Sequence, residues 1–386
     1  MKKALAVLGL SCHLAFGGYG GYILFQTVPS KAGASATSPY SLLIEGTFPQ
    51  FATIANGGKV AHTTTCGVDS IVCPADLTFA SDAGCVARYS GWEIIGYSPT
   101  TGQLTASIGI PTLSNASPVK VYGCVGNSSV TTFQGGSRGA AYDSNYQLAL
   151  HMEETSGSTL YDSTANANNA LKKASGNPSP TPVGEVGAAQ HFLGTANSAN
   201  NDYALFESLT PAIDTYTIEY WTKASSYISF DSVFLASSSG TPNRFTGFNW
   251  YPPGTVIYWN SWSTGLTPVA PATASLGVFH YIVFVRNADS MNVYVDGVAG
   301  TPDSGFGTGN EQWKGLGWDG GATGTSFNGV LDEVYYSNTA RSADYITARF
   351  NNLSSPSTFY TVGPYTTVSV MPLSTTRANS QVDIFF

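Results

Sequence analysis

The stretch that most constrains the fold is residues 327–336, F-N-G-V-L-D-E-V-Y-Y, near the end of the 386-residue chain. Asn328-Gly329 is a turn dipeptide, and a short strand is expected to follow it. Asp332 and Glu333 interrupt an apolar run, which a strand tolerates only where both carboxylates reach water, a hydrogen-bonding partner or a metal ion. Because side chains alternate along a strand, we expect Asp332 and Glu333 to point to opposite faces of the sheet.

Short β-rich runs separated by turn clusters continue this pattern along residues 20–136. They fall at hairpin spacing, and none shows the sustained period of about 3.6 that a helix requires. These residues therefore predict an all-β unit, a small β-sandwich or jelly roll. The expected strands are residues 22–27, 40–45, 75–80, 92–97, 104–110 and 119–125.

Composition is typical of an exported all-β protein. Only 10% of the residues are charged, against roughly 25% in an ordinary soluble domain. The formal net charge is −8, so no basic stripe neutralises phosphates and nucleic acid is not an expected partner. The five histidines are isolated in the sequence, and no histidine-based zinc site is expected.

Residues 1–17 have the features of a cleaved signal peptide. Lys2 and Lys3 precede a mostly apolar run at 4–16, and small residues follow at a plausible cleavage site. The alternative is a lipoprotein signal with its lipid on Cys12, although the preceding G-L-S fits that motif poorly. No later stretch has about 18 uninterrupted apolar residues, so no membrane span is expected. The predicted location is extracellular or at the cell surface, with the periplasm as an alternative.

Cysteine usage agrees with export. Besides Cys12 there are four cysteines, an even number that predicts disulfides with three possible pairings. Cys66 and Cys73 bracket a short loop and are most simply paired with each other, which leaves Cys85 to join Cys124. A zinc site is the rival interpretation, but no C-x-x-C spacing supports it.

The motifs of the first unit, residues 20–136, resemble the DUF2341 family in type and order. The resemblance implies an architecture, because this domain of unknown function commonly precedes a laminin-G-like sandwich; it supplies no catalytic residues. The matching motifs are A-N-G-G-K-V at 55–60, F-A-S-D-A-G-C at 79–85, W-E-I-I-G-Y-S-P-T-T-G at 92–102, I-P-T-L-S at 110–114, V-Y-G-C-V-G-N at 121–127 and Y-D-S-N-Y at 142–146.

Residues 142–352 resemble a laminin-G-like, concanavalin A-type β-sandwich. The resemblance rests on an opening strand with an Asp-, Ser- and Asn-rich loop at 148–171, on W-T-K-A at 221–224, on V-Y-V-D-G at 293–297 and on the strand at 327–336. A short helix is expected at 341–351, with Ser342 as its N-cap and with Ile346 and Phe350 on one face. Residues 353–386 form a β tail that could complete a sheet edge, pack on the first domain or begin a further domain.

Catalysis finds little support in the sequence. Residues 135–139, G-G-S-R-G, fit the G-x-S-x-G pattern, but no buried strand and helix flank them as a nucleophile elbow requires, so they indicate a linker. Glucanases that share the fold implied by the resemblance place carboxylates on one strand as E-x-D-x-x-E, and this chain has no such motif. Glu219 stands alone on its strand, and Asp332 and Glu333 are adjacent. No catalytic residue is therefore predicted.

Binding is the stronger interpretation. Aromatic rings offer flat apolar faces on which sugars stack, and the candidate ligand-binding residues are Trp250, Trp259, Trp262 and Trp313. The alternative is that they are core residues. Calcium is a feature that the resemblance implies, and its candidate oxygen ligands are Glu154, Asp162, Asn166 and Asp332. The alternative is that Asp162 and the nearby asparagines form turns.

These observations predict an exported, two-domain recognition protein that binds a glycan or surface polysaccharide through its second domain, with other extracellular proteins as further candidate partners. The alternatives are a glycan-active enzyme on the same fold and a structural subunit of an extracellular assembly.

Overall fold

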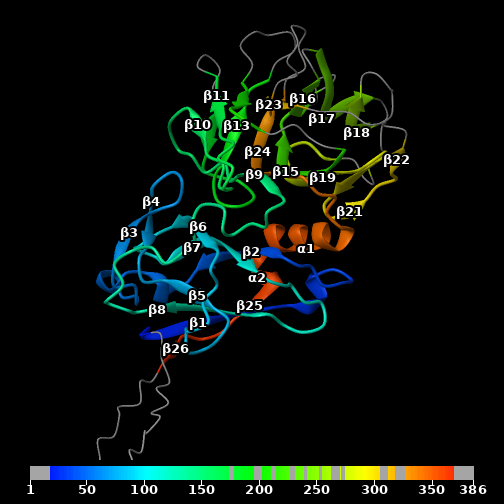
Figure 1. The fold of residues 1–386 in the computed structure, drawn as a ribbon. Helices are drawn as coiled ribbons and strands as arrows, with labels where there is room; N and C mark the ends of the chain where they lie inside the picture. Colours follow the sequence, from blue (N-terminus) through cyan, green and yellow to red (C-terminus); the bar gives the residue numbers. More distant parts are fainter. Residues whose placement is uncertain are drawn as a thin grey trace, which may run out of the picture.

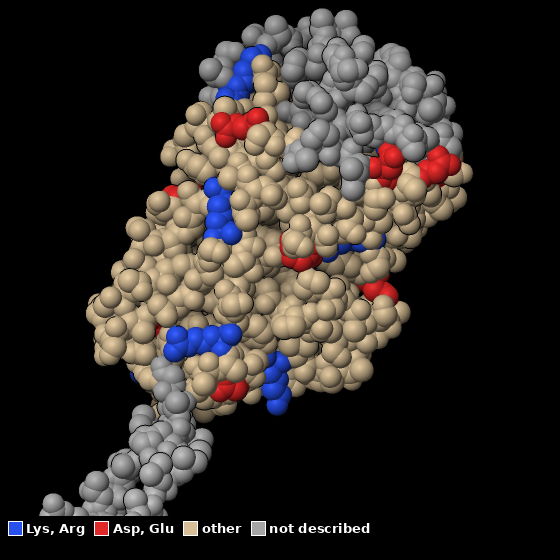
Figure 2. Space-filling view, in the orientation of Figure 1, with Lys and Arg blue, Asp and Glu red and all other residues tan. Residues whose placement is uncertain are grey.

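A computed structural model describes residues 18–173, 178–194, 202–209, 214–226, 231–238, 241–251, 254–261, 270, 274–304, 312–317 and 327–368. At 231–238, 241–251, 254–261 and 312–314 only the course of the backbone is described, Val233 excepted. The fold is all-β, as predicted, and its two domains meet at a single long helix (Figure 1). Figure 2 shows that charged side chains are few and scattered on the visible face of the molecule, in keeping with the low charged content.

The first domain contains two antiparallel sheets. One has the strand order β25-β1-β8-β5, with β26 also paired to β1, and the other has the order β2-β7-β6. All six expected strands are present, and a separate β3-β4 hairpin adds to them. The elements are β1 (Gly21–Thr27), β2 (Tyr40–Thr47), β3 (Thr63–Cys66), β4 (Ile71–Pro74), β5 (Thr78–Ala80), β6 (Trp92–Tyr97), β7 (Gln103–Ile110), β8 (Lys120–Val125), β25 (Tyr360–Val362), β26 (Thr366–Thr367), and the 3-10 helices η1 (Pro29–Lys31), η2 (Pro49–Phe51) and η3 (Ile54–Asn56).

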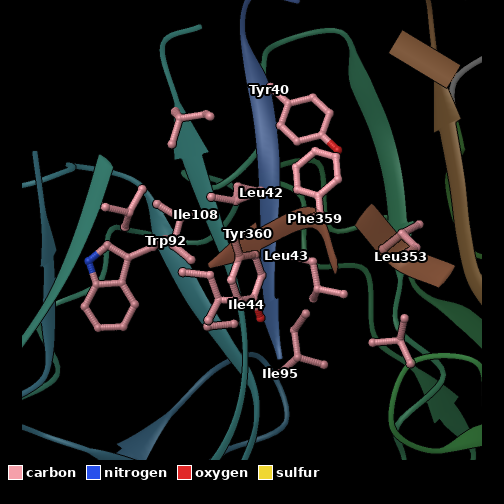
Figure 3. Packing of buried hydrophobic residues seen from close by; sticks show 14 of the residues in the cluster. Tyr40, Leu42, Leu43, Ile44, Trp92, Ile95, Ile108, Leu353, Phe359 and Tyr360 are labelled. Carbon is pink, nitrogen blue, oxygen red and sulfur yellow. The ribbon is translucent and has the colours of Figure 1, made fainter. Parts of the chain in front are cut away.

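The core of this domain follows from strand alternation. Along β1, buried and half-buried residues alternate because every second side chain faces the opposite sheet. Phe25 packs edge-on against Phe48 and Tyr360, with ring centroids 5.1 and 5.6 Å apart. Figure 3 shows Ile44 and Ile108 in the same core, beside Tyr360 of the returning C-terminal segment.

One of the two expected disulfides is present. Cys85 is bonded to Cys124 on β8, which confirms that pairing. Cys66 and Cys73 are buried free thiols, so the second expected bond is not formed in this structure. In the hairpin register Cys66 lies opposite Ile71 and Cys73 lies opposite Thr64, and the two thiols are in hydrogen-bonding contact. The two cysteines are therefore diagonal neighbours and not a directly opposed pair.

The second domain is a sandwich of two larger sheets. One runs β12-β13-β24-β15-β19-β20-β21, with β9 on β24 and β22 on β20, and the other runs β10-β11-β14-β23-β16-β17-β18. Its strands are β9 (Tyr146–Leu150), β10 (Thr159–Leu160), β11 (Ala170–Lys172), β12 (Ser179–Thr181), β13 (Ala189–Phe192), β14 (Ala204–Phe206), β15 (Thr215–Ala224), β16 (Asp231–Ser238), β17 (Thr241–Tyr251), β18 (Gly254–Ser261), β19 (His280–Asn287), β20 (Ser290–Val295), β21 (Val298–Ala299), β22 (Asp303–Ser304), β23 (Gln312–Leu316) and β24 (Gly329–Ser337).

A β-bulge in β24 corrects the expected directions of Asp332 and Glu333. Asp332 pairs with Trp221 and Tyr335 with Glu219, so two residues of β24 lie opposite one residue of β15. The inserted residue is Glu333, whose φ of 48° lies in the left-handed region. Leu331 and Val334 both enter the core between the two sheets, and the acids between them stand on the outer face. The prediction of opposite faces is therefore wrong, because simple alternation fails at a bulge.

Helix α1 (Ala343–Ser354) lies between the two domains (Figure 1). Ser342 caps it as predicted, its hydroxyl accepting a hydrogen bond of 3.2 Å from the Tyr345 N–H. Phe350 stacks on Trp221 of the second domain with ring centroids 5.9 Å apart. Toward the first domain, the Asn352 amide accepts from Leu43 N at 2.8 Å and donates to Leu43 O at 3.0 Å. A short helix α2 (Pro356–Phe359) then leads back to the first domain.

The start of the C-terminal tail completes a sheet of the first domain. β25 and β26 pair antiparallel with β1 at Phe25↔Val362 and Gly21↔Thr367. Two of the expected roles, completing a sheet edge and packing on the first domain, therefore apply up to residue 368. Residues 369–386 lie outside the described part of the chain.

Candidate functional site

Three adjoining cavities form a cleft between the two domains. The largest has a volume of about 430 Å³, the second about 210 Å³, and a small recess between them about 20 Å³. The first domain contributes the β3-β4 turn with Asp69 and strand β6 with Glu93 and Tyr97. The second domain contributes residues 151–163, which follow β9. A volume of several hundred Å³ is typical of small-ligand sites.

The inner end of the cleft is an imidazole held between two carboxylates. His151 Nδ1 lies 2.9 Å from Glu333 Oε1, and His151 Nε2 lies 3.1 Å from Glu93 Oε1. The Tyr142 hydroxyl donates to Glu93 Oε1 at 2.6 Å and lies 2.9 Å from His151 Nε2. Burial alone would lower the pKa of His151, but the two carboxylates raise it well above the ordinary value. The charged imidazole therefore links strand β6 of one domain to β24 of the other.

The wall next to His151 is acidic. Glu153 Oε1 accepts from Ala188 N at 3.0 Å, and Glu154 Oε1 accepts from Tyr161 N at 2.6 Å. Burial raises the pKa of Glu153 to about 8, and burial also raises the pKa of Glu154 and Asp69. Carboxyl groups with raised pKa values in a cleft are typical of functional sites, because the structure keeps them where ionisation is unfavourable.

The candidate calcium ligands do not converge. Asp162 Oδ1 accepts from Ala149 N and Thr164 N, and its Oδ2 accepts from Thr164 Oγ1 and Asn168 N. These four hydrogen bonds occupy both carboxylate oxygens of Asp162. They form the local turn that was the alternative to a calcium site at this residue. The Asn166 amide donates to Tyr146 O.

The other two candidate ligands are also held by neighbours. Glu154 lines the cleft, whereas Asp332 Oδ2 accepts from the backbone N–H groups of Glu185 and Val186. In the part of the chain that the structure describes, no three His, Cys, Asp or Glu side chains gather as a metal ion needs. The four residues do not fit a single calcium ion in this arrangement, and nothing below depends on one.

The aromatic candidates lie outside the described side chains. The structure gives only the backbone at Trp250 on β17, Trp259 on β18 and Trp313 on β23, and Trp262 is outside the described residues. Among the acids weighed for catalysis, Glu219 and Asp332 are both fully buried, each 0% exposed. Neither can touch a substrate.

No local pattern in the sequence pointed to Glu93 or His151. They are 58 residues apart and meet only because the two domains pack together. The acidic pair E-E at 153–154 was visible as part of the opening loop of the second domain, and it is the one feature that could have directed attention to the cleft.

Acidification from neutral pH should raise thermal stability, the reverse of common acid denaturation. Burial raises the folded-state pKa of Glu153 to about 8 and that of Glu185 to about 7, both above the ordinary value of 4.5. Between 4.5 and those values the folded state binds more protons than the unfolded state, so stability falls as pH rises. We expect the melting temperature to fall by several degrees from pH 5 to pH 8.

The variant Glu153→Gln should show a flatter dependence and a higher melting temperature than the parent at pH 8. Differential scanning fluorimetry across the pH series checks this, with Asp289→Asn on the exposed β19-β20 turn as the control. A melting temperature that rises steadily from pH 5 to pH 8 would contradict the burial of these acids.

Residues 197–347 match a family model described as the concanavalin A-like lectin/glucanases superfamily. The match covers less than half of the chain and lies in the second domain. It bears out the resemblance predicted for this part of the sequence. The DUF2341 resemblance of the first domain stays a prediction. No curated protein matches the chain significantly.

Solved structures with a similar fold include proteins of several kinds. Domain 4 of an extracellular arabinanase from Geobacillus stearothermophilus, in complex with arabinotriose, is 17% identical over 53% of this chain and 97% of that one, with a TM-score of 0.43. A pentraxin from Limulus polyphemus is 18% identical over 41% and 78%, with a TM-score of 0.35. The binding domain of botulinum neurotoxin DC is 11% identical over 54% and 52%, with a TM-score of 0.40. At TM-scores below 0.5, these likenesses do not indicate what this chain binds.

Proposed function

We propose that this chain is an exported recognition protein that binds a carbohydrate in the cleft between its two domains. The observation that carries the proposal is the lining of the largest cavity, about 430 Å³, where Tyr97 and Tyr161 stand among oxygen-bearing side chains. Phenol rings provide faces for the apolar side of a sugar, and carboxylates and hydroxyls accept and donate hydrogen bonds to its hydroxyl groups. The polar lining residues are Asp69, Glu153, Glu154, Thr155 and Ser156.

Two further observations support the proposal. Residues 197–347 match a superfamily named for lectins and glucanases. The Cys85–Cys124 bond is of the kind that persists in oxidising compartments. In the described residues, no helix is long and apolar enough to cross a membrane. The signal peptide at 1–17 and the surface location remain predictions.

Removing the phenol ring of Tyr161 should weaken glycan binding about tenfold, since a stacked aromatic ring contributes on the order of 1 kcal/mol. The backbone N–H of residue 161 still reaches Glu154 in the variant Tyr161→Ala, so the change tests the ring alone. A glycan array, with and without chelator, identifies the ligand and tests for calcium. Titration of that glycan then compares the parent with Tyr161→Ala.

The matched variant is Trp259→Ala on β18. Loss of binding in Trp259→Ala together with full binding in Tyr161→Ala would show that the glycan binds at the candidate tryptophans and not in the cleft. Release of reducing sugar by the parent that is lost in Glu153→Gln would show that the protein hydrolyses a glycan, which contradicts a role in recognition alone. Ordered fibres from a protein with no glycan affinity would favour the structural alternative.

A further inference from the structure

We propose that the small recess of the cleft binds an ammonium group, so that the preferred glycan carries a free amine. This inference rests on the proposed function, because it specifies the ligand of the same cleft. The recess has a volume of about 20 Å³, enough for one water-sized group. It shares Asp69, Glu153, Glu154 and Tyr161 with the largest cavity, so a sugar in that cavity lies next to it.

The charges around the recess favour a cation. Four carboxylates line it, those of Asp69, Glu93, Glu153 and Glu154, and His151 is the one basic side chain on its lining. Both nitrogens of His151 are engaged, one by Glu333 and one by Glu93 and Tyr142. The positive charge of the imidazole is therefore balanced by the carboxylates of Glu93 and Glu333. The other three acids on the lining, Asp69, Glu153 and Glu154, have no ion pair among the described residues, and the raised pKa of Glu153 keeps that carboxyl largely protonated at neutral pH until a cation lies beside it.

Glu154 has a buried carboxylate oxygen that lacks a hydrogen-bond donor. The residue is 9% exposed, and its Oε2 is buried and accepts no hydrogen bond from any described residue. Lys172 is close enough for its charge to influence Glu154, but its amino group donates to Gln190 Oε1 at 2.6 Å. A buried carboxylate oxygen without a donor is unfavourable, and an ammonium group brings three N–H donors together with the opposite charge.

The raised pKa of Glu153, about 8, points in the same direction. Its causes are burial first, with the nearby charges of Glu333 and Glu154 adding to the shift and Ala188 N–H and His151 opposing it. A cation placed beside this carboxyl would relieve the same penalty.

A metal ion is the less suitable occupant. Among the residues that the structure describes, no three acidic, histidine or cysteine side chains are arranged so that they could hold one metal ion. A metal ion requires such an arrangement, whereas an ammonium group needs only acceptors on separate walls. Tyr161 borders the recess and the larger cavity, so its ring can lie against the sugar that carries the amine.

The test compares two ligands of equal length on the full chain, the trimer of glucosamine and the trimer of N-acetylglucosamine. Calorimetric titration at low salt, at a pH where the amine is protonated, should show about tenfold tighter binding of the amine trimer. Added salt should reduce that difference, since it screens the charges. In Glu154→Gln the two trimers should bind equally. Asp289→Asn removes one charge outside the cleft and should keep the preference.

The possible results distinguish failure of the ammonium inference from failure of the glycan proposal. Equal binding of both trimers to the parent overturns the ammonium inference and leaves the glycan proposal intact, whereas no binding of either trimer overturns both for this class of sugar. A preference for the amine that survives in Glu154→Gln overturns the assignment to the recess. Should Glu154→Gln melt far below the parent, Asp69→Asn on the β3-β4 turn gives the same comparison, and a fully retained preference there also contradicts the inference.

Discussion

Replacing Arg349 by methionine is expected to destabilise the protein by about 3–5 kcal/mol, because removing one partner of a buried pair strands the other. Arg349 is 1% exposed, and its Nε lies 3.9 Å from Glu219 Oε2, which is fully buried. Its Nη1 donates to Ser41 O of the first domain at 3.2 Å, and its guanidinium lies 4.7 Å from the centre of the Tyr335 ring. One side chain on α1 thus contacts both domains.

A double-mutant cycle isolates the pair. The variant Glu219→Gln, Arg349→Met removes both charges and should recover much of the loss, since Tyr281 can still donate to the amide oxygen. Denaturant unfolding of the parent, the two single variants and the double variant measures the coupling. A loss below about 1 kcal/mol for Arg349→Met would mean that the arginine is dispensable at the interface.

Removing the Cys85–Cys124 bond should cost up to about 4 kcal/mol. The bond joins residues separated by 39 positions, and a loop of that length gives about this chain-entropy contribution. Cys124 lies on β8, which pairs with β1 and β5, and Cys85 lies in the loop after β5. The bond therefore links that loop covalently to the middle of the sheet. The variant Cys85→Ala, Cys124→Ala should therefore unfold at lower denaturant concentration than the parent.

The matched control is Cys66→Ala, Cys73→Ala, which removes two buried thiols without removing a bond of this structure. Reductant should destabilise the parent and this control, and it should leave the Cys85 and Cys124 variant unchanged. Alkylation after denaturation without reductant should label Cys66 and Cys73 but not Cys85 or Cys124. A 66–73 linked peptide in that experiment would restore the pairing expected from the sequence.

Local features of the fold could be read from the sequence. The alternating run at 22–27, the strand that follows Asn328 and the serine before α1 each depend on a few neighbouring residues, and each lies where it was expected. The turn expected at Asn328-Gly329 is not formed, because strand β24 already begins at Gly329. The Cys85–Cys124 pair was also within reach, because few pairings of four cysteines are possible.

The features that were missed depend on distant packing. The bulge at Glu333 lies opposite Glu219 and Trp221 of β15, which both contact α1, and no residue of 327–336 marks it. The cleft likewise requires the β3-β4 turn of one domain to face the 151–163 segment of the other. A linear pattern reports which side chains share a strand face, but it does not report which face of another domain will cover them.

The return of β25 and β26 to β1 has a mechanical consequence. Gly21 pairs with Thr367, so the described chain enters and leaves the molecule at one edge of one sheet. Figure 1 shows β26 beside β1 at one side of the first domain. Tension applied between residues 18 and 368 would open the short β1-β26 pair and then β1-β25, one ladder hydrogen bond after another. The cleft and the second domain would carry no load until that sheet had opened.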